Sequence, residues 1–235
     1  MNLRSATALA EKITDILRPL CQRIEIAGSI RRARPECNDI DLVLLADNPA
    51  AVLQRCRMHS QPVTDGPQIA IFRLTNGVQL DLYFARGPLP DLLDPKPTNW
   101  GSILLCRTGS KEHNIYLCQR ALAMGLKWET TTGIKDPDGY LLAAETEKDI
   151  YECLGFPYLA PNIRELDYLQ THFGKPGKIK QETAEVAEKT PSANSAASCK
   201  SDPIAAGRAL EQFQKLKHSL EQEIADEADR EQAAP

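Results

Sequence analysis

The feature that most constrains this chain is a glycine-serine turn followed closely by two acidic residues. The turn opens the stretch Gly28-Ser29-Ile30-Arg31-Arg32, and after six further residues come Asp39 and Asp41. A short apolar run precedes the turn, and a second, Leu42–Ala46, follows the acidic pair. Because apolar runs bounded by turn residues are typical of β-strands, we expect a strand, a tight turn, a short helix, a loop and a second strand.

The turn has the residue types that bind phosphate. Gly28 permits a sharp bend and a close approach to a ligand. Ser29 stands where a helix N-cap is expected, with free backbone N–H groups after it that suit an anion. Arg31 and Arg32 add guanidinium groups, which bind phosphate oxygens in a forked geometry. The sequence therefore predicts a phosphate site at this turn.

The acidic pair predicts a metal site beside the phosphate site. On a strand, Asp39 and Asp41 point to the same face. Two carboxylates on one face repel each other unless a cation lies between them, and a cluster of oxygens suits Mg²⁺. Two-metal phosphoryl transfer places the ions about 3.5–4 Å apart and calls for a third carboxylate.

A third carboxylate follows on a predicted β-hairpin. Asn76-Gly77 separates two apolar segments, Gln68–Leu74 and Val78–Ala85, which is the strongest short-range hairpin signal. Alternation along the second arm puts Gln79, Asp81 and Tyr83 on one face, so Asp81 lies on a strand among apolar residues, where an unpaired charge is costly. We therefore expect Asp81 to complete the metal site.

Each motif alone has an ordinary structural interpretation. An Asp-x-Asp is most often a solvated loop or strand end, and a Gly-Ser-x-Arg-Arg is most often a helix start. Together, with a later carboxylate on a strand, they resemble the palm of nucleotidyltransferases. The full form, with both arginines and six residues before Asp39-x-Asp41, resembles family X DNA polymerases of the polymerase β type.

A second region extends this resemblance. Thr108-Gly109-Ser110, followed by Asn114, resembles the subdomain that closes over the nascent base pair in this family. The stretch from Glu145 to Glu165 resembles the family's ending. The similarity covers roughly residues 5–172, and the Thr-Gly-Ser subdomain narrows it from nucleotidyltransferases in general to family X.

The resemblance implies roles for individual residues. Asp39 and Asp41 would bridge two Mg²⁺ ions, with Mn²⁺ as a substitute, and Asp81 would complete the site that activates a primer 3′-hydroxyl. Asn114 would meet the edge of the incoming base. The expected nucleotide-binding residues are Gly28, Ser29, Arg32, Cys37 and Asn38 at the triphosphate, Gly109 and Ser110 at the sugar, and Lys111 and Asn114 at the base.

Local signals predict several further elements. Residues 3–20 have the apolar spacing of an amphipathic helix, which Pro19 ends. Residues 107–110 are predicted as a turn, followed by a helix over 111–124 that Gly125 ends in a left-handed conformation. Thr146 is expected to open another helix, with Glu147 and Asp149 in its first turn and Gly155 at its end.

The expected fold class is α+β, a nucleotidyltransferase palm with a mixed sheet and flanking helices, a small α+β closing subdomain and a C-terminal tail. We expect the palm over residues 1–90 and the nucleotide-selecting subdomain over 91–174. A disordered linker is predicted for 175–204, because charged and small residues dominate it. Residues 205–235 are predicted as a tail whose helix, 205–231, is either solvated or a docking segment for a protein partner.

These observations predict a DNA polymerase that performs short-gap repair synthesis with primer–template or gapped DNA and deoxynucleoside triphosphates. The net charge of −4 gives no strong basic footprint, so we expect weak, salt-sensitive DNA binding. Two alternatives stay open: a template-independent nucleotidyltransferase acting on RNA ends or small molecules, and a non-catalytic binding module. Nothing resembles a signal peptide or a transmembrane segment, which predicts a cytoplasmic protein without membrane partners.

Three departures from the family pattern qualify the resemblance. Cys106-Arg107 replaces an aromatic pair that packs on the incoming sugar in many members, so ribonucleotides are expected to be poorly rejected. Cys118 stands where a basic residue often contacts the template side, which predicts low fidelity. There is no room before Leu3 for a lyase domain, so we expect a minimal form without lyase activity.

Overall fold

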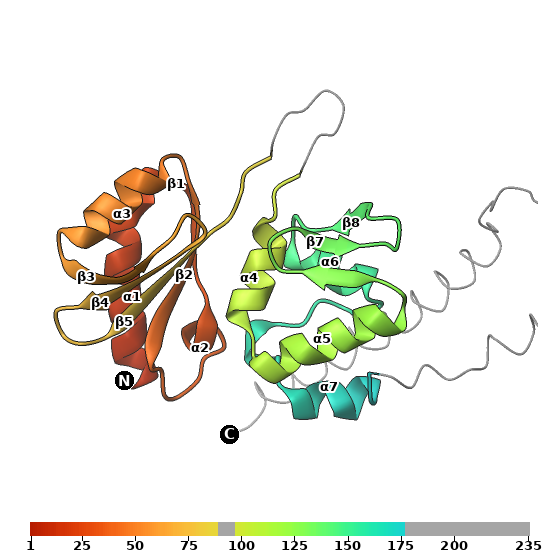
Figure 1. Ribbon diagram of the computed structural model, residues 1–235. Coiled ribbons are helices and arrows are strands. Elements are labelled where there is room, and N and C mark those ends of the chain that lie inside the picture. Colours follow the sequence, from red (N-terminus) through yellow and green to blue (C-terminus); the bar gives the residue numbers. More distant parts are fainter. Residues whose placement is uncertain (89–96, 177–235) are drawn as a thin grey trace, which may run out of the picture. The chain divides into compact units, whose positions relative to one another are not determined.

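The structure, a computed structural model, describes residues 1–88 and 97–176 (Figure 1). All of them belong to one compact unit, Met1–Ile179. The predicted linker from residue 177 onward and the predicted tail helix, 205–231, lie outside the described residues.

The chain begins with the predicted amphipathic helix. Helix α1, Leu3–Leu17, starts at Asn2, whose side-chain oxygen accepts the Ser5 N–H at 2.9 Å. Pro19 lies in a following 3₁₀ turn, η1 (Arg18–Leu20), which leads into the first strand. A side-chain cap at the first turn satisfies one of the donors that a helix start leaves free, and the proline prevents the α-helix from continuing.

Five strands form a mixed sheet in the order β1-β2-β5-β4-β3. Only β2 and β5 run parallel, and the other neighbours are antiparallel. The predicted hairpin is confirmed as β4 and β5. Strand β3 was missed because it contains Pro62, which an edge strand tolerates at a register shift. The strands are β1 Cys21–Ile26, β2 Asp39–Ala46, β3 Ser60–Asp65, β4 Ile69–Leu74 and β5 Gln79–Phe84.

The two faces of this sheet differ in what covers them. One face packs on α1 and α3 (Pro49–Arg57) and carries fully buried side chains such as Leu42 and Phe72, each worth about 1.5–3 kcal/mol of burial. On the other face Val43 packs with helix α4 (Trp100–Thr108). The strand alternation places Asp39, Asp41 and Asp81 on this second face.

The remaining elements form a second group with its own core. Helix α5 packs on α7, while α4 lies so close to α6 that a Cβ on Gly101 would come within 2.2 Å of the Thr146 backbone. Arg107 and Thr108, predicted as part of a turn, complete the last turn of α4 instead. The elements are α5 Lys111–Ala123, β6 Lys127–Glu129, β7 Gly133–Lys135, β8 Leu141–Ala143, α6 Glu147–Cys153, η2 Pro161–Ile163 and α7 Leu166–Phe173.

Local signals fixed the boundaries of this second group. Thr146 and Asp149 form a reciprocal capping box at the start of α6. Gly125 and Gly155 adopt positive φ after α5 and α6, as the predicted left-handed helix ends require. The mixed sheet and the small antiparallel sheet β6-β7-β8 confirm the α+β class. Across the described residues, none of the helices combines the length and apolar character needed to span a bilayer.

Candidate active site

Gly28 is required because a carboxylate lies against its backbone. It opens the four-residue helix α2, Gly28–Arg31, with φ of 59°. A Cβ at this position would lie 1.8 Å from Oδ2 of Asp41, so only glycine fits. The predicted N-cap is wrong by two residues: Ala27 occupies that position, and Ser29 lies inside the helix with a buried Oγ that has no hydrogen-bond partner.

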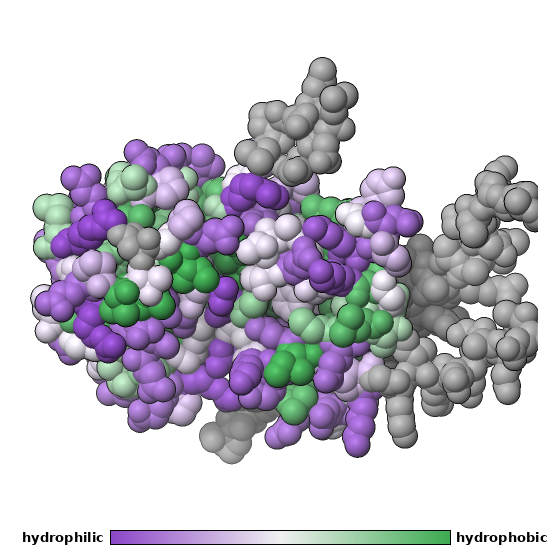
Figure 2. All heavy atoms as spheres, viewed as in Figure 1, coloured by the Kyte–Doolittle hydropathy of each residue, from purple (hydrophilic) through white to green (hydrophobic). Residues whose placement is uncertain are grey.

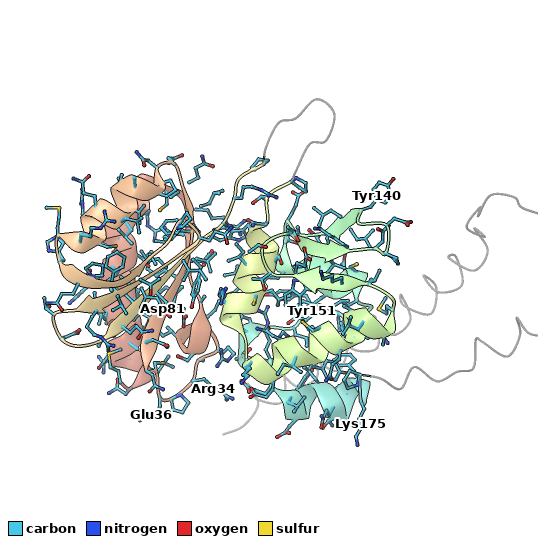
Figure 3. All side chains as sticks on the ribbon, in the orientation of Figure 1. Arg34, Glu36, Asp81, Tyr140, Tyr151 and Lys175 are labelled. Carbon is cyan, nitrogen blue, oxygen red and sulfur yellow. The ribbon has the colours of Figure 1, made fainter. Side chains whose placement is uncertain are left out.

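The three carboxylates lie on neighbouring positions of the two parallel strands. Asp41 of β2 pairs in register with Asp81 of β5, and Asp39 pairs with Gln79. Paired residues of adjacent parallel strands share a face, so the acidic side chains stand together on the α4 side of the sheet. Figure 3 labels Asp81 within this sheet. The structure therefore brings the two predicted segments to one place.

One hydroxyl connects two of the carboxylates. The Tyr83 hydroxyl lies 3.3 Å from Oδ1 of Asp41 and 3.3 Å from Oδ2 of Asp81. The Gln79 amide donates to the other Asp81 oxygen at 2.9 Å. Both oxygens of Asp81 therefore accept hydrogen bonds from residues of its own strand. The sequence predicted Gln79 and Tyr83 on the same face as Asp81 but gave neither residue a role in the site.

The electrostatics of this cluster are those of crowded like charges. Burial, together with the nearby charges of Asp39 and Asp81, raises the pKa of Asp41 to about 7. Burial also raises the pKa of Asp81, against hydrogen bonds from Gln79 and Tyr83 that lower it. An anionic cluster that resists ionisation in this way is stabilised by a cation, and such perturbed groups concentrate at functional sites.

The donor set fits a hard divalent cation. Carboxylate oxygens from adjacent strand positions are the ligands that Mg²⁺ prefers. Within residues 1–88 and 97–176, however, no three His, Cys, Asp or Glu side chains gather closely enough to enclose a metal ion. Gln79 and Tyr83 donate hydrogen bonds to the oxygens of Asp81, which a cation would also use.

A cavity of about 540 Å³ opens beside Asp39 and Asp41. Its other walls come from α2, from the end of α4 and from one face of α5. The cavity brings together most of the predicted nucleotide-binding residues, namely Gly28, Ser29, Arg32, Gly109, Lys111 and Asn114. Cys106, Arg107, Thr108, Ile115, Cys118 and Gln119 complete the lining.

Cys37, Asn38 and Ser110 are absent from this lining, although all three were predicted to bind nucleotide. Cys37 is fully buried in the core of the first sheet, and its N–H donates to the Met1 carbonyl at 2.8 Å. Asn38 is exposed beside Asp39. Ser110 serves as the N-cap of α5, where its Oγ accepts the His113 N–H.

The loop before Asp39 is held by the start of the chain. The Cys37 N–H donates to the Met1 carbonyl, and the Leu3 N–H donates to the Pro35 carbonyl at 3.0 Å. Asn2 forms an antiparallel bridge with Glu36. Residues 1–3 and 35–37 thus pair like two short strands, a long-range contact that no sequence pattern signalled.

Arg31 has a different partner from the phosphate that the sequence suggested. Its guanidinium donates to both carboxylate oxygens of Glu147, at 2.7 and 2.8 Å, and to Thr108 Oγ1 at 2.8 Å. The fully buried Arg164 donates to the same Glu147 at 2.6 Å. Burial opposes ionisation of Glu147, but the hydrogen bonds from Arg31 and Arg164 lower its pKa overall. This ion-pair cluster joins α2 to α6.

Arg32 lines the cavity and also forms a hydrogen bond with the last residue of α4. Its guanidinium donates to the Thr108 carbonyl, and its Nε lies 3.5 Å from Glu165. Arg34, labelled in Figure 3, contacts the same Glu165 at 2.7 Å. The arginine-rich turn thus binds residues of the second group at several points.

Helix α5 presents Asn114 through a chain of buried hydrogen bonds. The Asn114 amide donates to the Cys106 carbonyl at 2.7 Å, and its Oδ1 lies 3.1 Å from Nδ1 of His113. Nε2 of His113 lies 2.7 Å from the hydroxyl of Tyr151 on α6. Burial lowers the pKa of His113 to about 4, so its ring is neutral at pH 7. These contacts fix the orientation of the predicted base-contacting residue.

The exposed face of α5 is apolar where it meets the cavity. Ile115 and Cys118 line the cavity, and Ile115 and Leu122 are 47% and 67% exposed. Figure 2 shows apolar residues over this helix on the visible face. Arg107, at the junction of α4 and the sheet, stacks its guanidinium 4.3 Å from the centre of the Tyr83 ring.

Comparison with known proteins identifies relatives of both halves of this structure. Residues 103–165 match the family model described as DNA polymerase beta thumb. The DNA polymerase/3′-5′ exonuclease PolX of Bacillus subtilis (strain 168) is 29% identical over 142 residues, which cover 59% of this chain and 24% of that protein. The chain therefore spans about a quarter of the length of this curated relative.

Solved structures of low sequence identity share the fold. The ternary P/T complex of Leishmania infantum polymerase beta superposes with a TM-score of 0.56 at 17% identity, covering 70% of this chain and 76% of that one. The ternary gap complex of the same protein gives a TM-score of 0.57 at 15% identity, covering 70% of each chain. The α+β arrangement of the mixed sheet and the small antiparallel sheet is thus that of polymerase β structures.

Proposed function

We propose, from the premise that this chain is a polymerase β-like member of family X, that it adds deoxynucleotides to the 3′ end of a DNA strand. In this proposal the strand belongs to a primer–template or gapped duplex, and the reaction serves short-gap repair synthesis. The solved relatives carry such DNA by their descriptions. The division into a palm, residues 1–90, and a nucleotide-selecting subdomain, 91–174, belongs to the same proposal.

The observation that carries the proposal is the register of two strands. Asp41 and Asp81 are paired neighbours that share the Tyr83 hydroxyl, and Asp39 stands beside them at the cavity. Such a crowded set of oxygens suits two Mg²⁺ ions, or Mn²⁺ in their place. When bound, the metals supply an activated 3′-hydroxyl and neutralisation of phosphate charge.

The residues of this chain position the reactants around that cluster. Asp81 faces the 3′ end of the primer, because it lies on β5 and does not line the nucleotide cavity. Asp39 and Asp41 line the cavity itself. Arg32 places positive charge at the triphosphate, and Lys111 lies near the base. Asn114, held by the Cys106 carbonyl, offers its remaining hydrogen-bonding capacity to the base edge. Fixed groups of this kind lower the barrier mainly by positioning and by electrostatic stabilisation.

A template-independent transferase is the second candidate, and the face of α5 favours it. Ile115, Cys118 and Gln119, which line the cavity along α5, are uncharged, so none of these three offers a charge to a templating base. Apolar stacking against such a face is tolerant of sequence. Extension without a template would therefore need no change to the acidic cluster.

Primer extension separates these possibilities. The purified chain is mixed with gapped, recessed or blunt DNA, one nucleotide at a time, with Mg²⁺ or Mn²⁺. Insertion of only the complementary nucleotide into gapped or recessed DNA supports the proposal. Equal use of all four nucleotides on blunt ends supports the second candidate. No extension with either metal, from a folded protein, overturns both.

A further inference from the structure

A second cavity, of about 300 Å³, lies next to the first and shares Arg107 with it. It is bounded by the end of β5, the segment before β4, helix α4 and the turn between β6 and β7. The function proposed above makes no use of this cavity. Its polar side chains include Arg86, Asn99 and Arg107.

Among its described lining residues, this cavity carries positive charge and no acidic side chain. Arg86 and Arg107 contribute two guanidinium groups, and the described lining residues include no aspartate or glutamate. The Nε of Arg86 is buried and has no hydrogen-bond partner, while one terminal nitrogen lies 3.4 Å from the Pro97 carbonyl. A buried donor without a partner is unfavourable, so an acceptor in the cavity would be favoured.

The backbone around Arg86 is fixed in advance. Its N–H donates to Oδ1 of Asn99 at 2.6 Å, and its carbonyl accepts the Thr98 hydroxyl at 2.7 Å. The Asn99 amide in turn donates to the Thr131 carbonyl at 2.7 Å, which ties the β6–β7 turn to the cavity. Asn99 is only 5% exposed. The walls are therefore preorganised, and binding an anion would require little reordering.

We propose that this cavity binds a phosphate group of the nucleic-acid strand, with Arg86 as its principal donor and Arg107 as the shared wall toward the catalytic face. The proposal rests on the function proposed above, because it places the phosphate on the strand whose 3′ end reaches Asp81. Arg107 stacks on Tyr83, whose hydroxyl touches Asp81, so the cavity and the acidic cluster are separated by one layer of side chains. A guanidinium binds phosphate oxygens in a fork, and free inorganic phosphate offers the same chemistry.

The test compares three variants of the full chain in DNA binding without nucleotide or metal. Arg86→Gln removes the charge and keeps the backbone contacts, and Arg86→Lys restores the charge without the fork. Arg55→Gln, at an exposed position of α3 outside this cavity, is the matched control. Fluorescence anisotropy with a recessed primer–template gives Kd from 50 to 200 mM salt, and thermal unfolding shows that each variant is folded.

We expect Arg86→Gln to weaken binding about five- to tenfold at 50 mM salt, as for loss of one partly exposed charged hydrogen bond. The slope of log K against log salt should become shallower by about 0.9, the value for one lost phosphate contact. Arg86→Lys should recover most of the slope, and Arg55→Gln should match the parent protein. A folded Arg86→Gln variant with unchanged affinity and slope would overturn placement of a strand phosphate in this cavity.

Calorimetric titration with inorganic phosphate distinguishes the source of the anion. Phosphate binding that Arg86→Gln abolishes, with unaltered DNA affinity, would assign the cavity to a free anion. No phosphate binding and no DNA effect would remove the site altogether. These binding measurements need no turnover. If the protein fails in primer extension but Arg86→Gln weakens DNA binding as expected, the proposed polymerase activity is wrong and the proposed phosphate site stands.

Discussion

Two charged clusters in this molecule are built on opposite principles. On the α4 side of the five-stranded sheet, Asp39, Asp41 and Asp81 crowd like charges together, and the pKa of Asp41 rises to about 7 with burial as the largest cause. At the α2–α6 junction, Glu147 is at least as buried, yet two arginines surround it and its pKa falls. Arg31 and Arg164 form ion pairs with Glu147 in the second cluster. In the first cluster Arg32 and Arg107 only partly offset the repulsion, and none of the described residues forms an ion pair with the three aspartates.

This difference indicates that the Glu147 cluster stabilises the fold, whereas the aspartate cluster is suited to binding a cation. A carboxylate that accepts hydrogen bonds from two guanidinium groups is satisfied and holds two elements together. Carboxylates that repel one another destabilise the protein unless a bound cation offsets the repulsion. Strained arrangements of this kind concentrate at functional sites. Substitutions in the aspartate cluster should therefore reduce activity, and substitutions in the Glu147 cluster should reduce the free energy of unfolding.

The largest effect is expected for Asp81→Asn. Removing this carboxylate should lower single-turnover primer extension with Mg²⁺ by at least about 10²–10³-fold, the scale for loss of one electrostatic group at a reacting centre. The thermal stability of the metal-free protein should not fall, because a repulsive charge has been removed. Asp138→Asn, in the exposed β7–β8 turn, is the control. Near-parental turnover by Asp81→Asn would show that the catalytic cluster was misidentified.

The second prediction addresses the satisfied cluster. Glu147→Gln leaves the guanidinium groups of Arg31 and Arg164 without their counter-charge, and should reduce the free energy of unfolding by about 3 kcal/mol. Glu152→Gln removes a surface partner of Lys148 at 3.7 Å and should cost less than about 1 kcal/mol. Urea unfolding at pH 7 measures both. Equal stabilities of the two variants would contradict the contrast between the clusters.

The third prediction uses pH on the buried histidine of α5. His113 has a pKa of about 4 in the folded protein against an ordinary 6.5. Between these values the unfolded chain binds a proton that the folded chain does not, so stability falls as pH is lowered. From pH 7 to pH 5 the loss assigned to His113 is about 2 kcal/mol.

Urea unfolding of the parent protein and of His113→Gln at both pH values measures this loss. The glutamine variant should lose less stability than the parent over that interval. His59→Gln, at an exposed position, serves as control and should follow the parent. The Glu147 ion pairs contribute little to this comparison, because a lowered carboxylate pKa affects stability only below its ordinary value of 4.5. Identical slopes for all three proteins would refute a neutral buried His113.

The sequence contained enough local information to place the acidic cluster. Alternation put Asp39, Asp41 and Asp81 on strand faces, and Asn76-Gly77 defined the hairpin that carries the last of them. These are period-2 and turn signals, which act over a few residues. They also predicted the capping of α6 by Thr146 and the ends of α5 and α6.

Contacts between distant segments had no comparable signal. Glu147 was predicted as a first-turn acid of α6, but its partner Arg31 lies 116 residues earlier. Arg31 was predicted to bind phosphate because it follows the Gly28-Ser29 turn. Tyr83 shared a face with Asp81 in the predicted strand, yet its hydrogen bond to Asp41 depends on strand pairing that the sequence alone does not specify. The N–H of Cys37, which was expected near the triphosphate, donates to the carbonyl of Met1, a contact that no local pattern signals.

The pairing of residues 1–3 with residues 35–37 has a practical consequence for anyone who purifies this protein. That pairing contributes to the position of the segment leading to Asp39, so a fusion handle ahead of Met1 would adjoin the backbone that supports the acidic cluster. Preparations that carry such a handle and those from which a protease has removed it should be assayed side by side before any activity is ascribed to the chain.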